Sequence, residues 1–266
     1  MSEHSFVWDA VQRVRTGAPL VHNITNYVVM NTTANALLAA GASPVMAHAR
    51  EEVEELAGLC SSLVLNIGTL SKPWIESMFA AGRIAQSRGV PVVLDPVGAG
   101  ASSLRTWTSL DLLRELNISV LRGNASEILA LSGAGSRTKG VDSIHQAADA
   151  ADAARELAGK FGCVVVVSGA EDLITDGSSD VLVRGGHDMM PRITGMGCTA
   201  TALVAAHAAV AGSVLDGAAA GMGVMAVAGT MASRKAKGPG SFQMHFIDAL
   251  YGMQSFDVEA GVEIVR

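Results

Sequence analysis

Short apolar runs alternate with longer segments of helical periodicity along most of this chain. Runs rich in Leu, Ile and Val occupy residues 63–67, 90–94, 118–121 and 163–167, and polar or glycine-rich residues bound each of them. Nearly continuous apolar runs are typical of strands buried on both faces, whereas half-exposed strands alternate apolar and polar positions. The pattern predicts strands at these four segments, and a shorter strand at 43–47.

Between the strands, apolar residues recur every three to four positions, which predicts helices. In the first helix, from Phe6 to Thr16, one face would carry Val7, Val11 and Val14. Further helices are predicted at residues 31–41, 51–59, 73–87, 110–116, 125–131 and 144–161. This alternation predicts an α/β fold in which helices cover both faces of a mostly parallel sheet.

The alternation changes after the last of these strands. Residues 172–176 and 180–184 flank Gly177-Ser178, which predicts an antiparallel hairpin at the edge of the sheet. Three helices are expected to close the chain, and a Gly- and Ser-rich stretch at 132–139 predicts a loop. Because there is no linker, repeat or second composition, we expect one domain over residues 1–266.

Polar or glycine-rich turns follow several of the predicted strands directly. They comprise Gly68-Thr69, Asp95 to Gly100, Arg122 to Asn124, and Ser168-Gly169. Ligands of open α/β sheets bind beyond the carboxyl ends of the strands. The sequence therefore predicts that these turns converge on one crevice.

The stretch from Thr194 to Thr199 indicates what that crevice binds. It reads TGMGCT and stands directly before a long Ala-, Leu- and Val-rich run that predicts a helix. Glycine lets the backbone approach a ligand closely, and the first amides of a helix lack intrahelical acceptors and attract anions. The stretch therefore predicts an anion hole. The same field is expected to favour the thiolate of Cys198, in the first turn.

Composition narrows the class of protein. Of 266 residues, 49% are hydrophobic and 4% aromatic, which allows a large core of closely packed helices on a sheet. A net charge of -6 without any long basic block argues against nucleic acid and anionic membranes as partners. Three widely spaced cysteines and no signal-peptide pattern predict a cytoplasmic protein. The most apolar region, 198–232, is interrupted by Asp216 and several glycines, which predicts two buried helices with a turn near Gly212-Ser213.

Several catalytic motifs are missing from the sequence. It contains no G-x-x-x-x-G-K-[ST], no H-E-x-x-H and no G-x-S-x-G, which excludes a P-loop, a zincin helix and a nucleophile elbow. Gly195 to Ala200 fits the permissive dinucleotide pattern G-x-G-x-x-A, but so does Gly221 to Ala226 inside a predicted helix. The first match also lies near the end of the predicted sheet and not after its first strand, so a hydride-transfer enzyme is disfavoured.

Six motifs, taken together and in order, resemble those of the hydroxyethylthiazole kinase family within the ribokinase-like superfamily. They are VHNITN at 21–26, GASPVM at 41–46, LNIGTL at 65–70, LDPVGAG at 94–100, RGNASE at 122–127 and GMGC at 195–198. The resemblance covers about residues 19–242 and implies a single ribokinase-like kinase domain. It implies transfer of the ATP γ-phosphoryl group, with Mg²⁺, to the primary alcohol of 4-methyl-5-(2-hydroxyethyl)thiazole for thiamine biosynthesis.

The resemblance also assigns roles to individual residues. It implies catalytic roles for Cys198, Gly195 and Gly197, and thiazole binding by Met46, Gly195, Asn26 and Gly68. It implies ATP binding by Arg122, Ser168, Gly169 and Asn124, and a place near the metal for Glu127 and Asp95. It further implies a homotrimer whose neighbouring subunits share each thiazole pocket.

Structural explanations compete with these roles. Asn124 and Glu127 would equally serve as a helix N-cap with a first-turn carboxylate, and a lone Met such as Met46 is more often a core residue. The asparagines at 23 and 26 fit chain turning as well as ligand orientation. At the level of activity, a pyrimidine kinase, a dehydratase of hydrated nicotinamide cofactors and a non-catalytic binding protein share the fold; the Asn23–Asn26 region and Cys198 disfavour the first two.

Overall fold

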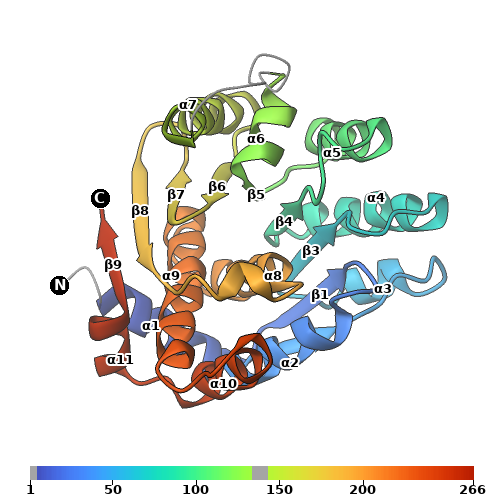
Figure 1. Cartoon of the computed structure of the whole chain (residues 1–266). Coiled ribbons are helices and arrows are strands. Elements are labelled where there is room, and N and C mark those ends of the chain that lie inside the picture. The colour runs from blue at the N-terminus through green and yellow to red at the C-terminus, as the bar shows by residue number, and fades with distance from the viewer. Residues whose placement is uncertain (1–4, 134–142) are drawn as a thin grey trace.

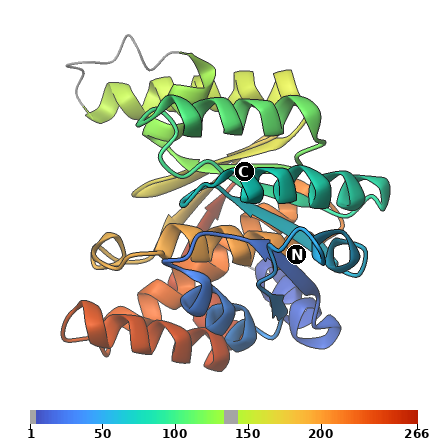
Figure 2. The same ribbon diagram turned by 90° about the vertical axis from the view of Figure 1, so that its right-hand side faces the viewer.

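The computed structural model describes residues 5–133 and 143–266 as one layered α/β unit (Figure 1). Most of the predicted loop at 132–139 lies outside the described residues. Figure 2 shows the sheet edge-on between two helical layers, with green and yellow helices on one side and blue, orange and red helices on the other. The predicted fold class is confirmed.

The described residues form one nine-stranded sheet in the order β2-β1-β3-β4-β5-β6-β7-β8-β9. The first six strands along that order pair in parallel, and the last three add in antiparallel fashion. The strands are β1 (Leu20–Ile24), β2 (Ser43–Val45), β3 (Ser62–Asn66), β4 (Val92–Asp95), β5 (Val120–Asn124), β6 (Val164–Ser168), β7 (Glu171–Thr175), β8 (Asp180–Gly185) and β9 (Val262–Val265).

Both faces of the sheet are covered. One face carries α1 (Ser5–Gly17), α2 (Met30–Ala40), α8 (Met196–Ala208), α9 (Val214–Ser233), α10 (Pro239–Gly252) and α11 (Ser255–Gly261). The other carries α3 (Val53–Ala57), α4 (Lys72–Ser87), α5 (Ser103–Glu115), α6 (Ala125–Ser132) and α7 (Ser143–Phe161). Successive strand residues enter opposite cores: Val64 packs with the first set, and Leu63 and Leu65 with the second. This two-sided burial explains the continuous apolar runs.

The C-terminal part differs from the expected three closing helices. Four helices follow residue 195, and the chain then returns to the sheet as β9, which pairs with β8. The predicted antiparallel hairpin is present as β7 and β8. It does not form the edge of the sheet, because β9 lies outside β8. Four residues with alternating burial carry too little pattern to identify a strand that long-range pairing stabilises. Helix α5 also begins earlier than predicted, at Ser103, where Ser102 accepts a hydrogen bond from the Arg105 amide.

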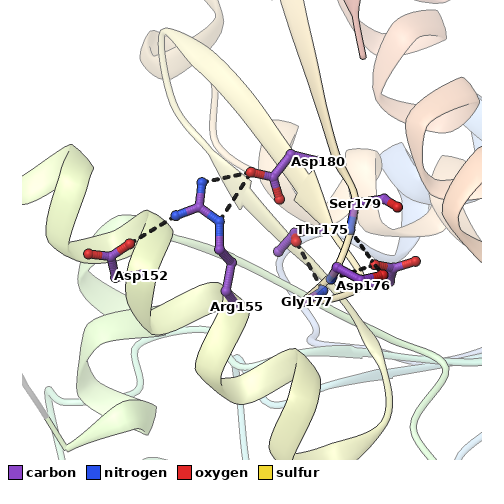
Figure 3. Close-up of polar contacts among 8 residues, drawn as sticks. Asp152, Arg155, Thr175, Asp176, Gly177, Ser179 and Asp180 are labelled. Carbon is purple, nitrogen blue, oxygen red and sulfur yellow. Dashed lines mark hydrogen bonds and ion pairs between the residues drawn. The ribbon is translucent and has the colours of Figure 1, made fainter.

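Hydrogen bonds from Arg155 connect the β7–β8 hairpin to helix α7, which packs against it (Figure 3). Arg155 of α7 donates through Nη2 to Asp180 Oδ2 at 2.6 Å, and through Nη1 to Asp152 Oδ1 at 2.9 Å. At the turn, Asp176 accepts from the amides of Ser178 and Ser179. These contacts are exposed, so they orient the hairpin more than they stabilise it.

Helix α9 is long and apolar enough to cross a membrane by length and composition, but 72% of its most apolar window is buried inside this fold. It packs against α8, α10 and α1, so its apolar surface belongs to the core. The predicted pair of buried helices is confirmed, with α8 ending at Ala208 and α9 beginning at Val214.

Candidate active site

The predicted crevice lies where the parallel strands end. The last residues of β3 and β4, Asn66 and Asp95, stand opposite each other in the sheet. Asn124 and Ser168, which end β5 and β6, are likewise opposite one another. Neighbouring strands thus deliver polar side chains to a single edge, as the alternation of strands and helices predicted.

Helix α8 begins at this edge with the glycine loop. Gly195 is its N-cap residue and has φ 85°, and a Cβ there would lie 2.7 Å from Val29 Cγ1. Only glycine combines this left-handed backbone with so close an approach. The first amides of α8 have no intrahelical acceptor, and the N-terminal end of its dipole adds positive potential. The predicted anion hole therefore has the required backbone geometry.

Arg122 adds a buried positive charge to this loop. Its side chain is 8% exposed, and its Nη2 donates to Ser168 Oγ at 2.6 Å. A Cβ on Gly197 would lie 2.8 Å from Arg122 Nη1, so the guanidinium lies directly against the first turn of α8. Its Nε is buried and has no hydrogen-bond partner among the described residues. A buried cation beside a helix N-terminus makes a strong site for a phosphoryl group.

A hydrogen-bonded chain connects this loop to the candidate metal residues. Asp95, 1% exposed, accepts from Asn66 Nδ2 at 2.9 Å and from Thr201 Oγ1 at 2.7 Å. Asn66 Oδ1 in turn accepts from Asn26 Nδ2 at 2.9 Å and from the amide of Gly68 at 3.0 Å. Burial raises the pKa of Asp95 to about 6, although nearby Arg122 lowers it. One network therefore joins residues at or just after the ends of β1, β3 and β4 with Thr201 of α8.

The expectation for Cys198 was wrong in one respect. Its Sγ lies 3.5 Å from Asn26 Nδ2, within the network. Burial, followed by the charge of Asp95, raises the pKa of the Cys198 thiol to about 12. Desolvation and a neighbouring carboxylate thus outweigh the hydrogen bonds from Asn66 and Asn26 and the charge of Arg122, which favour the thiolate. The side chain is a neutral thiol at physiological pH.

The two candidate metal residues, Asp95 and Glu127, interact electrostatically. The charge of Glu127 adds to the rise in the pKa of Asp95 that burial causes. Glu127 also closes a capping box with Asn124, and its Oε1 accepts from the Gly98 amide at 2.8 Å. No group of three or more His, Cys, Asp or Glu side chains within residues 5–133 and 143–266 could enclose a metal. Mg²⁺ is commonly held by one or two carboxylates together with waters and substrate phosphates. Asp95 and Glu127 fit that kind of binding.

The candidate substrate residues are only partly brought together. A Cβ on Gly68 would lie 2.7 Å from Asn26 Nδ2, so these two residues are in contact, and Asn26 also lies beside Cys198. Met46 lies one strand further out, directly after β2, where His22 Nε2 and the Ala47 carbonyl are 2.8 Å apart. Gly169, which is expected to bind nucleotide, donates its amide to Asp172 Oδ1.

Two residues of the network had no role assigned from sequence. Asn66 accepts two hydrogen bonds and donates one, and Thr201 contacts Asp95 from the face of α8 that also carries Cys198. A polar residue at the end of a buried strand, and a threonine three positions after Cys198, were the available signals. Neither signal specifies a partner without the strand order.

Comparisons with known proteins agree with this geometry. The family model for the hydroxyethylthiazole kinase family matches residues 11–255. A hydroxyethylthiazole kinase from Nitratidesulfovibrio vulgaris (strain DSM 19637 / Miyazaki F) is 62% identical over 265 residues, covering 100% of this chain and 98% of that one. The structure of hydroxyethylthiazole kinase from Pyrococcus horikoshii OT3 superposes with a TM-score of 0.89 at 42% identity, covering 98% and 100% of the two chains.

A structure with much lower sequence identity has a similar fold. A ribokinase-like superfamily protein from Enterococcus faecalis V583 has a TM-score of 0.65 at 11% identity, covering 87% of this chain and 84% of that one. At that identity the likeness concerns the fold alone. With the family match over most of its length, a near-complete relative at 62% identity and the glycine loop in place, this chain belongs to the hydroxyethylthiazole kinase family.

Proposed function

We propose that this protein transfers the γ-phosphoryl group of ATP to the primary alcohol of 4-methyl-5-(2-hydroxyethyl)thiazole, a step of thiamine biosynthesis. The observation that carries the proposal is the start of α8, where free amides and buried Arg122 form an anion site beside Cys198 and Asn26. Family membership supplies the acceptor alcohol, which the named relatives act on.

The anion site stabilises the transferred group. Amides of the loop at Gly195 and Gly197, together with the Arg122 guanidinium, would hold the equatorial oxygens, which carry the charge of a loose transition state. Ser168, Gly169 and Asn124 lie at the ends of β5 and β6 and would bind the nucleotide side of ATP. The bond from phosphorus to the ADP oxygen breaks as the bond to the alcohol oxygen forms.

Asp95 and Glu127 would bind Mg²⁺ together with the phosphates of ATP. When bound, the ion supplies neutralisation of the phosphate charge. The hydrogen bonds from Asn66 and Thr201 orient the Asp95 carboxylate, and the Gly98 and Asn124 amides orient that of Glu127. These bonds fix both carboxylates before any ligand binds.

The neutral thiol of Cys198 would position the acceptor alcohol. A thiol with a pKa of about 12 is a poor proton acceptor at neutral pH. In a loose transition state the alcohol proton leaves late, when its oxygen is already bonded to phosphorus, so little base assistance is needed. Asn26, Gly68 and the backbone of Gly195 would contact the thiazole beside this alcohol, and Met46 would contact it from the adjoining strand end.

We place the enzyme in the cytoplasm as a homotrimer in which a neighbouring subunit helps to complete each thiazole pocket. The support on this chain is apolar surface beside Asn26: Tyr27 is 66% exposed and Val28 is 62% exposed. The three cysteines, all of them free, agree with a reducing compartment. Sedimentation at several protein concentrations tests the assembly.

The activity is tested by mass spectrometry of products from Mg-ATP and the thiazole alcohol, with the pyrimidine alcohol of thiamine biosynthesis and hydrated NADH as parallel substrates. Thiazole phosphate and ADP in equal amounts are expected. Product from the pyrimidine alcohol or from hydrated NADH alone would replace the proposal with a rival activity of the same fold. No product from a folded protein would make it a binding protein.

A further inference from the structure

Arg105 joins two loops that line the candidate active site. From the first turn of α5, its Nη2 donates to the Gly68 carbonyl and its Nη1 to the Val97 carbonyl, both at 2.7 Å. These loops follow β3 and β4, which are neighbours in the sheet. The guanidinium therefore fixes the distance between two strand-end turns that are otherwise far apart in sequence.

Both carbonyls that Arg105 binds lie next to residues with a proposed function in the site. Gly68 touches Asn26 on the thiazole side. Gly98, next to Val97, donates its amide to Glu127 Oε1 on the metal side at 2.8 Å. A displacement of Arg105 would thus change the separation between the acceptor alcohol and the phosphates.

The shape and charge of the contact suit a guanidinium. Gly98 has φ 73°, and a Cβ there would lie 2.7 Å from Arg105 Nη1, so this turn leaves space that the guanidinium fills. Both recorded acceptors are neutral carbonyls, and no ion pair of Arg105 occurs among the described residues. The planar fork of arginine can reach two acceptors at once, which a lysine ammonium on its flexible stem does less well.

We propose that Arg105 is a positioning residue for phosphoryl transfer, holding the thiazole side and the metal side of the site in register. The proposal rests on the proposed function. Its effect should fall on turnover, because misplacement of reacting groups by about 1 Å costs on the order of 10²-fold in rate.

Arg88 provides a matched control. Its Nη1 also donates to two backbone carbonyls, those of Cys60 at 2.8 Å and Ala57 at 3.4 Å. This bridge precedes β3, at the opposite end of the strand from the site. Arg88→Ala therefore removes a similar cross-link without touching the strand-end turns.

The experiment compares wild type, Arg105→Ala, Arg105→Lys and Arg88→Ala in steady-state kinetics and thermal unfolding. We expect kcat to fall roughly ten- to a hundredfold in Arg105→Ala and less in Arg105→Lys. Arg88→Ala should keep kcat within about twofold of the wild-type value, although its Tm should fall about as much as that of Arg105→Ala. Millimolar guanidinium ion should restore part of kcat in Arg105→Ala only, which a purely structural role would not produce.

Amide hydrogen exchange separates this proposal from the proposed function. In Arg105→Ala, peptides covering 66–70 and 96–100 should exchange faster than in wild type, and in Arg88→Ala they should not. If kcat of Arg105→Ala stays within twofold of wild type, or falls only in step with Tm as in Arg88→Ala, the positioning role is refuted. If the wild type makes no thiazole phosphate, the proposed function fails. Unchanged exchange of these peptides in Arg105→Ala would show that Arg105 does not hold the two loops together.

Discussion

At the scale of single residues, the environment of Cys198 decides its chemistry. The thiol lies at a helix start, which favours the thiolate, yet burial and Asp95 raise its pKa to about 12. Burial raises the pKa of the neighbouring Asp95 to about 6, so of these two groups it is Asp95 that is ionised at neutral pH. The chain therefore keeps a weak proton acceptor where its acceptor alcohol is proposed to bind.

Replacing this thiol by a carboxylate tests how much proton transfer limits turnover. We expect Cys198→Asp to raise kcat at saturating ATP, because a carboxylate accepts the alcohol proton more readily than a thiol of pKa about 12. The increase should stay below the roughly 10²-fold of a well-placed general base, since the proton leaves late. Cys198→Ser, which stays neutral, serves as control. Unchanged or lower turnover in Cys198→Asp would show that proton transfer does not matter at this position.

Gly195 offers a second test at this scale. Gly195→Ala places a Cβ 2.7 Å from Val29 Cγ1 and holds a non-glycine residue at φ 85°. The backbone strain alone costs about 1–2 kcal/mol. Gly162→Ala has the same kind of strain at φ 64° but meets no atom within 4 Å. We expect both variants to lose stability in urea unfolding, Gly195→Ala by more because its new Cβ also meets Val29. Only Gly195→Ala should lose more than tenfold in kcat. Equal activity in the two variants would argue against the anion hole.

Many of the site residues could be named from sequence, but their partners could not. Asp95 and Arg122 directly follow predicted strands, which placed them at one edge of the sheet, and Glu127 was named by the family resemblance. The roles of Asn66 and Thr201 depend on the order β1-β3-β4 and on how α8 crosses it. Hydrogen bonds between residues 106 positions apart, such as that between Thr201 and Asp95, leave no local pattern.

At the scale of elements, long apolar periodicity was a reliable guide and short alternation was not. The predicted strands and helices before residue 170 are confirmed within a few residues, except for the early start of α5. Two strands were not predicted. β1 was missed because it carries polar His22 and Asn23, which the structure buries. The four-residue β9 was missed because its stability comes from pairing with β8 and packing against the helices, and not from its own sequence.

The contribution of β9 can be measured with adjacent residues. Ile264 is 4% exposed and packs in the core under α1 and α9, whereas Val265 is 37% exposed. We expect Ile264→Ala to lower the free energy of unfolding by about 2–5 kcal/mol, and Val265→Ala by less than about 1 kcal/mol. Denaturant titration of both variants measures this difference. Equal small losses would mean that β9 does not pack as described.

At the scale of the whole molecule, burial of titratable groups links stability to pH. His207 is 1% exposed, and burial lowers its pKa to about 4, although its Nδ1 lies 2.7 Å from the Leu203 carbonyl. Between about pH 4 and 6.5 the unfolded chain binds a proton there that the folded chain does not, so stability falls as pH drops through this range. Complete loss of this contribution to the free energy of unfolding would amount to roughly 3 kcal/mol.

The opposite sign applies to the carboxyls of buried Asp95 and half-buried Asp172. Burial raises the pKa of Asp95 and of Asp172 to about 6, so the folded chain holds those protons more tightly and stability falls as pH rises from about 4 to 6. In the wild type, the pH dependence from His207 and that from the two carboxyls therefore partly cancel. The contribution of His207 is measured as the difference in stability between the wild type and a variant that lacks this histidine. We expect His207→Leu to gain stability relative to wild type as pH falls from 7 to 4, measured by urea unfolding. A constant difference would show that His207 is not neutral in the fold.

What the sequence determined by itself was local: the strand–helix alternation, the polar strand ends, the glycine loop before α8, and the six motifs that indicated the family. Periodicity and backbone freedom are properties of a few neighbouring residues, so they can be seen in the chain alone. Tertiary structure alone decided the edge position of β9, the neutral state of Cys198, and the contacts of Asn66, Thr201 and Arg105. Each of these depends on desolvation or on partners far away in the sequence, and both arise only when the sheet and its two helical layers come together.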